Sequence, residues 1–145
     1  MIGDEISCLK NVGSKQLKEA NSYCQLLNAR QILPRSKQES DDLVSALLSM
    51  NLISEGGKTV VSIDIYNSTE GWYDSAGQLV SYFNWLQNEP DDLSGKHNYA
   101  GLLIDEKNNS FGWADYGSTN ELNVVCTKKA GNGKNKSLLL IYSPV

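Results

Sequence analysis

Two stretches in the first half of the chain repeat apolar residues at the spacing of an amphipathic helix. In the first, such residues recur at intervals of three and four: Leu17, Ala20, Cys24 and Leu27. This spacing predicts a helix over residues 15–27, with Ser14 as its N-cap and Cys24 pointing into the core.

The second stretch opens with a capping box, Ser36-Lys-Gln-Glu39, in which each of the two end side chains can satisfy a free amide of the first helical turn. Apolar residues follow at helical spacing: Leu43, Leu47 and Met50. The pattern predicts a second helix from Ser36 to about Met50.

From Thr59 onward the pattern changes to short strands separated by turn residues. Residues 59–65 alternate and are rich in β-branched side chains. Further predicted strands cover residues 79–82, 99–104, 112–115 and 123–127. The polar stretch over 83–98 contains Pro90 and predicts a long loop, and a loop of this length in a compact domain is usually functional. Two helices followed by several strands predict an α+β fold.

Composition and charge exclude several functions. The 145 residues suit one domain, and 40% hydrophobic with 21% charged residues is ordinary for a globular protein. The net charge is −4 and the longest basic cluster is Lys128-Lys129, so we expect no nucleic-acid partner. No apolar run approaches the ~20 residues of a membrane span. Nothing marks an activated nucleophile, so we expect no enzyme.

The two ends of the chain differ in character. Residues 1–6 lack the basic end and apolar core of a signal peptide, which leaves open a removed signal or a cytosolic protein. Residues 130–137 have the composition of a flexible linker. The run Leu138-Leu-Leu-Ile-Tyr142 is short and apolar, and we expect it to add an edge strand or to cover an apolar patch.

The chain has three cysteines, Cys8, Cys24 and Cys126, and one histidine, His97. No C-x-x-C pair occurs and His97 cannot complete a zinc set with the cysteines, which argues against a zinc site. The odd count permits one disulfide and one free thiol. Three unpaired cysteines are the alternative.

Four short motifs in the second half carry a family resemblance. In chain order they are Val80-Ser-Tyr-Phe-Asn-Trp85, Glu89-Pro-Asp91, Trp113-Ala-Asp115 and Val124-Val-Cys126. Together they resemble the C-type lectin family, whose pattern reads Tyr-x-Asn-Trp, Glu-Pro-Asn, Trp-Asn-Asp and a final cysteine. The resemblance covers about residues 11–127. It implies a C-type lectin-like fold of two helices, antiparallel sheets and a long loop region over residues 1–129, with 1–10 as an N-terminal extension and 130–145 as linker and tail.

The resemblance also implies one disulfide. In the family a cysteine of the opening helix is bridged to the final cysteine, and Cys24 and Cys126 hold these two places. A disulfide implies a secreted, extracellular protein. Cys8 then has no partner within the chain and suggests a disulfide-linked partner protein, with a simple exposed thiol as the alternative. The cysteines of the family's second bridge are both absent here.

The family's loop and following strand hold calcium, and sugar hydroxyls complete the metal's ligand shell. The resemblance assigns Glu89, Asp91 and Asp115 as both calcium and carbohydrate ligands. His97 takes a fourth metal position that is usually acidic, with an ordinary surface residue as the alternative. Ala114 takes the fifth position, which is usually Asn. Because calcium prefers six to eight oxygen ligands, we expect weak calcium binding.

Sugar binding is expected to suffer more than calcium binding. Asp91 and Ala114 stand where the family has two amide donors, and an ionised carboxylate only accepts hydrogen bonds. We therefore predict a secreted protein that recognises glycans or glycoproteins through a degenerate calcium site. The alternative is a calcium-independent module that binds protein.

Two further expectations concern surface and core. Sequons at Asn67, Asn108 and Asn135 lie in predicted loops and indicate a glycoprotein. The three tryptophans lie in strand-like contexts and are expected to anchor the core instead of stacking on sugar. They are Trp72, Trp85 and Trp113.

Overall fold

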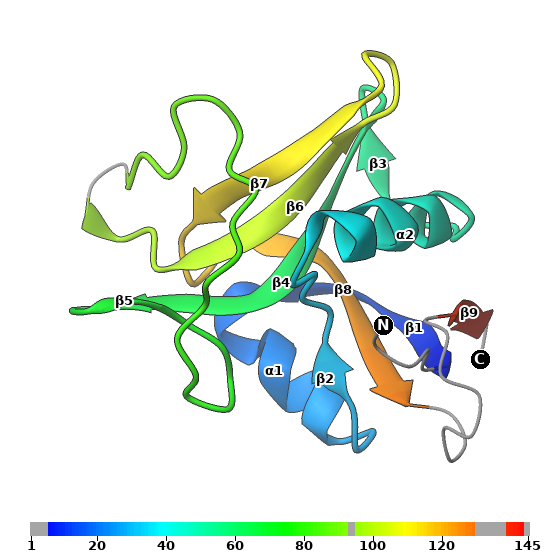
Figure 1. Cartoon of the computed structure of the whole chain (residues 1–145), viewed down its shortest axis with the longest axis horizontal. Coiled ribbons are helices and arrows are strands. Elements are labelled where there is room, and N and C mark those ends of the chain that lie inside the picture. The colour runs from blue at the N-terminus through cyan, green and yellow to red at the C-terminus, as the bar shows by residue number, and fades with distance from the viewer. Residues whose placement is uncertain (1–5, 93–94, 130–138, 144–145) are drawn as a thin grey trace.

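A computed structural model describes residues 6–92, 95–129 and 139–143, and Figure 1 shows how its elements are arranged. In chain order these elements are β1 (Ile6–Gln16), α1 (Leu17–Gln25), β2 (Arg30–Gln31), α2 (Lys37–Leu48), β3 (Ser54–Glu55), β4 (Lys58–Ser68), β5 (Gly71–Tyr73), β6 (Tyr99–Asp105), β7 (Ser110–Tyr116), β8 (Glu121–Lys129) and β9 (Leu139–Ser143).

The described strands form one sheet, with the order β7-β6-β4-β8-β1-β9 and with β2, β3 and β5 paired at its sides. Most neighbours are antiparallel, as the resemblance implied. The exceptions are β1 with β9, which are parallel, and one parallel bridge from β4 to β8 at Val61 and Asn123. The fold is α+β, as predicted, but the sheet is mixed.

The first helix begins later than its sequence predicts. Ser14 and Lys15 lie in β1, opposite Asn123 and Leu122 of β8, so Ser14 is not an N-cap. The first helical amides donate instead to backbone carbonyls. Leu17 N donates to the carbonyl oxygen of residue 120, and Lys18 N donates to that of residue 118, each at 3.0 Å. Long-range pairing of β1 with β8 thus replaces the local capping signal. Helix α1 ends at Gln25, two residues before its predicted end.

The second helix follows its prediction closely. Ser36 Oγ accepts a hydrogen bond from Glu39 N, as a capping box requires. The Glu39 side chain reaches one residue further back and accepts from Arg35 N. The predicted apolar face is buried, with Leu43, Leu47 and Met50 each at most 7% exposed.

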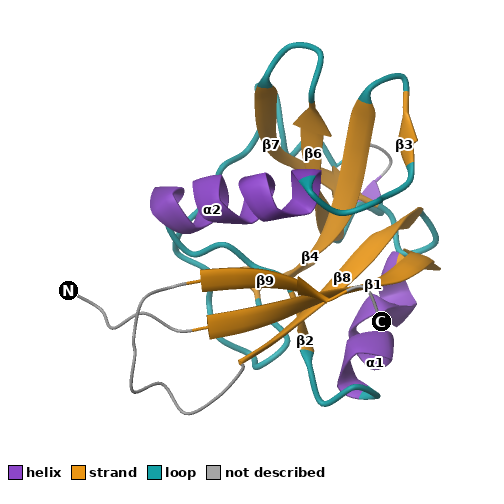
Figure 2. Ribbon diagram, turned by 90° about the vertical axis from the view of Figure 1, so that its right-hand side faces the viewer, coloured by secondary structure: helices purple, strands orange, loops and turns teal. Residues whose placement is uncertain are grey.

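Both ends of the chain join the same edge of the sheet. Residues 6–10, expected as an extension, form the first half of β1. The apolar tail adds an edge strand, as predicted, because β9 pairs with β1 from Ile6 opposite Leu139 to Lys10 opposite Ser143. Figure 2 shows β9 beside β1, with α2 nearby. The predicted linker over 130–137 lies outside the described residues.

The core lies mainly between α2 and the strands β4, β6 and β7. The predicted tryptophan anchors belong to it, since Trp113 is 0% and Trp72 9% exposed, while Trp85 is partly buried against them. A smaller cluster joins α1 to β8 through the disulfide between Cys24 and Cys126. This disulfide closes a loop of about 100 residues, which in the chain-entropy model stabilises the fold by about 4–5 kcal/mol.

Residues 74–98 connect β5 to β6 and include the predicted long loop. The strand predicted over 79–82 does not form; only Leu79 makes an isolated bridge, to Tyr73. Figure 1 shows the last part of this connection, in light green, beside the start of β6 and the end of β7, away from α2. No helix among the described residues is long and apolar enough to cross a membrane.

Candidate functional site

The loop after Phe83 is fastened to strand β7. Trp113 N donates to Asn84 O at 2.8 Å, and Leu86 N donates to Trp113 O at 2.9 Å. Gly112 makes this approach possible, since a Cβ atom there would lie 2.6 Å from Cδ2 of Leu86. The loop therefore reaches residues 89–92 from a fixed starting point next to the end of β7.

Asp115, near the end of β7, organises the tip of this loop. Its side chain is fully buried, and its two carboxylate oxygens accept hydrogen bonds from the backbone amides of Asp91 at 3.1 Å and Asp92 at 2.7 Å. The Glu89–Pro90 peptide bond just before them is cis. The loop backbone and the Asp115 carboxylate thus hold each other in place.

Glu89 and Asp115 influence each other's ionisation. Burial, followed by a hydrogen bond with Asp115 and the charge of Asp91, raises the pKa of Glu89 above its ordinary value. Burial also acts to raise the pKa of Asp115. The hydrogen bond with Glu89 and those from the amides of Asp91 and Asp92 outweigh that effect and lower the pKa. Of the two carboxyl groups, Asp115 is the one that holds its negative charge more readily.

His97, just before β6, brings its imidazole to the same place. Its Nδ1 atom lies 3.7 Å from Asp115 Oδ2 and 3.8 Å from Asp91 Oδ1. This nitrogen is buried and has no hydrogen-bond partner in the described part of the chain. The backbone amide of His97 donates to Asp92 Oδ1 at 3.0 Å, which fixes the residue to the loop tip.

Three of the four metal positions expected from the sequence therefore converge. Donor atoms of Asp91, His97 and Asp115 all lie within 4.8 Å of one another. Glu89 is not a member of that group, although its carboxyl group interacts with Asp115, and its Oε1 atom is buried without a hydrogen-bond partner among the described residues. Ala114, beside Asp115, is 8% exposed and supplies no donor.

These donors do not form the oxygen cage that calcium prefers. Asp91 and Asp115 supply oxygen, but the third converging donor is an imidazole nitrogen, and calcium sites in proteins are built from oxygen ligands. The imidazole of His97 lies within 4 Å of both carboxylates. The cluster is an acidic pair that faces one histidine.

A second acidic cluster, which the sequence did not reveal, forms where β4 and the residue after β5 meet the segment from β2 to the start of α2. Asp74 is fully buried and accepts hydrogen bonds from Ala76 N, Gln78 N and Arg35 Nη2, the last at 2.7 Å. Arg30 Nη2 lies 3.6 Å from Asp64, which also accepts from Ser75. No local pattern joins residues this far apart in sequence, so only the fold could bring them together.

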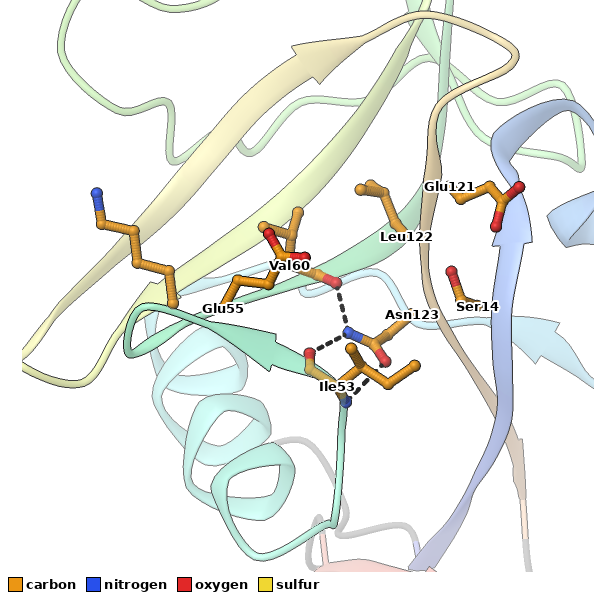
Figure 3. Close-up of a pocket in the computed structure, with 8 residues that line it drawn as sticks. Ser14, Ile53, Glu55, Val60, Glu121, Leu122 and Asn123 are labelled. Atoms are coloured by element: carbon orange, nitrogen blue, oxygen red, sulfur yellow. Dashed lines mark hydrogen bonds between the residues drawn. The ribbon is translucent and has the colours of Figure 1, made fainter.

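Two hollows on the described surface lie away from the Asp91 cluster. One, of about 310 Å³, is drawn in Figure 3, where Asn123 uses its side chain to bind Ile53 and Val60. Its two carboxylates, from Glu55 and Glu121, stand on opposite sides of the hollow. Another, of about 380 Å³, lies between α1 and β4. Neither hollow gathers donors as the loop tip does.

Comparisons with known proteins agree with this fold. The Lectin C-type domain family matches the chain at residues 13–128. Salivary C-type lectin 2 from Aedes albopictus is 35% identical over 54 residues, which make up 37% of this chain and 36% of that protein. The match thus spans about a third of that relative's length.

Solved structures show the same architecture. The C-type lectin domain of murine dendritic cell inhibitory receptor 2, in complex with N-glycan, has a TM-score of 0.66 and 17% identity, over 86% of this chain and 90% of that one. Human lithostathine has a TM-score of 0.68 and 20% identity, over 83% of this chain and 81% of that one. At these identities the likeness establishes the fold alone.

Proposed function

This chain belongs to the Lectin C-type domain family, and we propose that it is a secreted protein that recognises glycans through a degenerate calcium site. Members of the family are generally non-enzymatic carbohydrate-binding proteins. The observation that carries the proposal is the convergence of Asp91, His97 and Asp115 at the tip of the loop fastened to β7. The N-glycan bound by the murine neighbour supports glycans as the ligand class.

Calcium binding at this site is weak in our proposal. Glu89, Asp91 and Asp115 keep the negative charge, but carbonyls and water must supply most of the oxygens that calcium requires. Burial, the hydrogen bond with Asp115 and the charge of Asp91 together raise the pKa of Glu89, which disfavours the ionised form that a calcium ligand needs. We expect an affinity for calcium well below that of a complete site.

Sugar binding is weakened further because two donors are missing. A hydroxyl on the metal would face a carboxylate at Asp91 and a methyl group at Ala114, and neither can donate a hydrogen bond. Each such bond is worth about 1 kcal/mol, and up to about 3 kcal/mol with a charged partner. The loss of two bonds is enough to remove detectable monosaccharide binding from a weak site.

Secretion and a covalent partner complete the proposal. The disulfide between Cys24 and Cys126 supports an oxidising compartment, and the salivary relative supports secretion. Cys8, half-buried in β1, is unpaired among the described residues and is the proposed link to a partner protein. Native material should run as a larger species on a non-reducing gel and shift down on reduction. A monomer band without reductant would contradict the link.

Glycosylation is also proposed. Asn108 lies in the exposed turn between β6 and β7, as predicted for a glycan acceptor, although its side chain donates to Asp105. Asn67 lies within β4, not in the predicted loop, and Asn135 lies outside the described residues. We therefore expect Asn108 to be the occupied sequon. Intact-mass analysis before and after glycosidase treatment tests this assignment.

A glycan screen with a gain-of-function variant tests the main proposal. The unmodified protein should bind monosaccharides poorly, whereas Asp91→Asn with Ala114→Asn restores both donors and should bind mannose-type sugars in calcium but not in chelator. We expect mannose-type sugars because Glu89-Pro-Asp91 resembles the Glu-Pro-Asn motif of the family's mannose-binding subgroup. The matched control, Glu106→Gln with Ala76→Asn, makes the same kinds of change at exposed positions and should gain nothing.

Two outcomes would contradict the proposal. Tight calcium-dependent monosaccharide binding by the unmodified protein would show that the site is intact. A double variant that folds and gains nothing would favour the alternative, a module that binds protein without calcium.

A further inference from the structure

We infer that the cluster of Asp91, His97 and Asp115 binds a divalent transition metal of the zinc class in preference to calcium. The inference rests on the proposed function, because it names the metal of the same site. The three donors are one imidazole nitrogen and two carboxylates, and their donor atoms lie within 4.8 Å of one another. The sequence argued against zinc only for a site built with the cysteines, and none of them belongs to this cluster.

The chemistry of the donors favours metals that bind imidazole nitrogen. Imidazole is a good ligand for zinc, copper, iron and nickel, whereas calcium takes oxygen. Zinc is bound in proteins by histidine nitrogen and by aspartate or glutamate oxygen, and three protein ligands leave a position open for water or an external ligand. The half-exposed Asp91 lies on the open side of the cluster, while Asp115 is buried.

The spacing of the donors suits a shared metal better than a direct contact. A hydrogen bond from a protonated His97 to a carboxylate would be about 2.7–2.9 Å long. The observed separations of 3.7 and 3.8 Å exceed this. Two ligands at 2.0–2.2 Å from a tetrahedral zinc lie about 3.4 Å apart, so a shift of a few tenths of an ångström brings His97 to this spacing from each carboxylate.

Backbone contacts hold two of the ligands in place. Asp115 receives amides from both residues 91 and 92, and the His97 amide donates to Asp92. Such outer contacts orient metal ligands, and their loss typically weakens metal binding about 10–100-fold. His97 Nδ1 and Glu89 Oε1 are buried atoms without a hydrogen-bond partner in the described chain. The first lies at the cluster, and the second belongs to a residue that contacts Asp115.

Metal titration of the full chain tests the inference. Isothermal titration with zinc and, separately, with calcium should give an affinity for zinc at least about tenfold tighter. His97→Ala should weaken zinc binding about tenfold or more and leave calcium binding nearly unchanged, because calcium does not depend on the nitrogen. His97→Asp should weaken zinc and strengthen calcium. Cys8→Ser is the control for zinc capture by the free thiol and should bind zinc like the unmodified protein.

The single histidine provides a second readout that does not depend on sugar. Its imidazole resonances in NMR should shift when zinc is added and remain in place with calcium. Equal affinities for the two metals, an unshifted imidazole, or unchanged zinc binding in a folded His97→Ala protein would each overturn the inference. These results are independent of the glycan screen, so a failure to bind glycans leaves the metal assignment intact and the reverse also holds.

Discussion

The molecule contains two acidic clusters that share the same backbone hydrogen-bonding pattern but differ in the basic side chain that lies next to the buried aspartate. In each, one aspartate side chain is fully buried and accepts two backbone amides: Asp74 from residues 76 and 78, and Asp115 from residues 91 and 92. Arg35 lies 2.7 Å from Asp74 and completes the first cluster. In the second, the imidazole of His97 lies 3.7 Å from Asp115 in place of an arginine.

This difference separates a structural cluster from a binding cluster. A buried carboxylate must be compensated by a cation or by hydrogen bonds, because the charge alone is costly to bury. At Asp74 the negative charge is compensated within the protein, by backbone amides and by arginines that are permanently charged. At Asp115 the chain supplies the two backbone amides and places a histidine nearby where the first cluster has an arginine. We therefore propose that the second cluster binds a ligand and that the first stabilises the fold.

The largest expected effect comes from neutralising the structural cluster. Asp74→Asn keeps one acceptor for the amides but turns an amide group toward Arg35. Breaking a buried pair costs about 3–5 kcal/mol, and because Arg35 is 44% exposed we expect a loss of about 2–3 kcal/mol. Urea unfolding at neutral pH measures it. Glu106→Gln, at an exposed position, is the control and should change little. A loss below about 0.5 kcal/mol at Asp74 would remove the contrast between the clusters.

Acid should reduce the stabilisation that the ionised Asp74 cluster gives to the fold. Burial tends to raise the pKa of Asp74, but the hydrogen bonds from Arg35 and from the amides of Gln78 and Ala76 outweigh it and lower the pKa. The stabilisation is therefore fully present above the ordinary pKa of about 4 and is lost as the pH falls through the lower folded value. Urea midpoints from pH 6 to pH 3 should fall more steeply for the unmodified protein than for Asp74→Asn. Parallel curves would contradict this.

The smallest effect on stability is expected at the binding cluster. Asp91→Asn removes one of the converging charges and no arginine contact, so the free energy of unfolding in chelator should change by no more than about 0.5 kcal/mol. The same variant should weaken zinc binding. Thermal melting in chelator and titration with zinc measure the two effects. A destabilisation as large as that of Asp74→Asn would make the second cluster structural too.

Local signals in the sequence predicted well wherever an element carries its own pattern. The capping box at Ser36 is a contact between near neighbours. The buried face of α2 and the strand over 59–65 have distant partners, but each carries its own helical or strand pattern, which is what the prediction used. The disulfide between Cys24 and Cys126 was predicted from the family resemblance, since no local pattern specifies it.

The predictions that were wrong or absent concern contacts between residues far apart in the sequence. Ser14 reads as an N-cap, yet pairing of β1 with β8 keeps it in a strand. The parallel pairing of β9 with β1 joins the two ends of the chain, which periodicity cannot reveal. The family resemblance placed His97 at a metal position. The prediction of no zinc site considered only cysteines and histidine as ligands and did not consider carboxylates. Only the fold brings the Nδ1 atom of His97 close to Asp91 and Asp115.

Diffraction from crystals grown with equal concentrations of calcium and zinc tests the central claim most directly, because anomalous differences at the zinc edge identify the metal and its ligands together. We predict one zinc peak bound by His97 Nδ1 and by carboxylate oxygens of Asp91 and Asp115, at about 2.0–2.2 Å. Calcium at that position with His97 turned away, or no metal between the three side chains, would contradict the account.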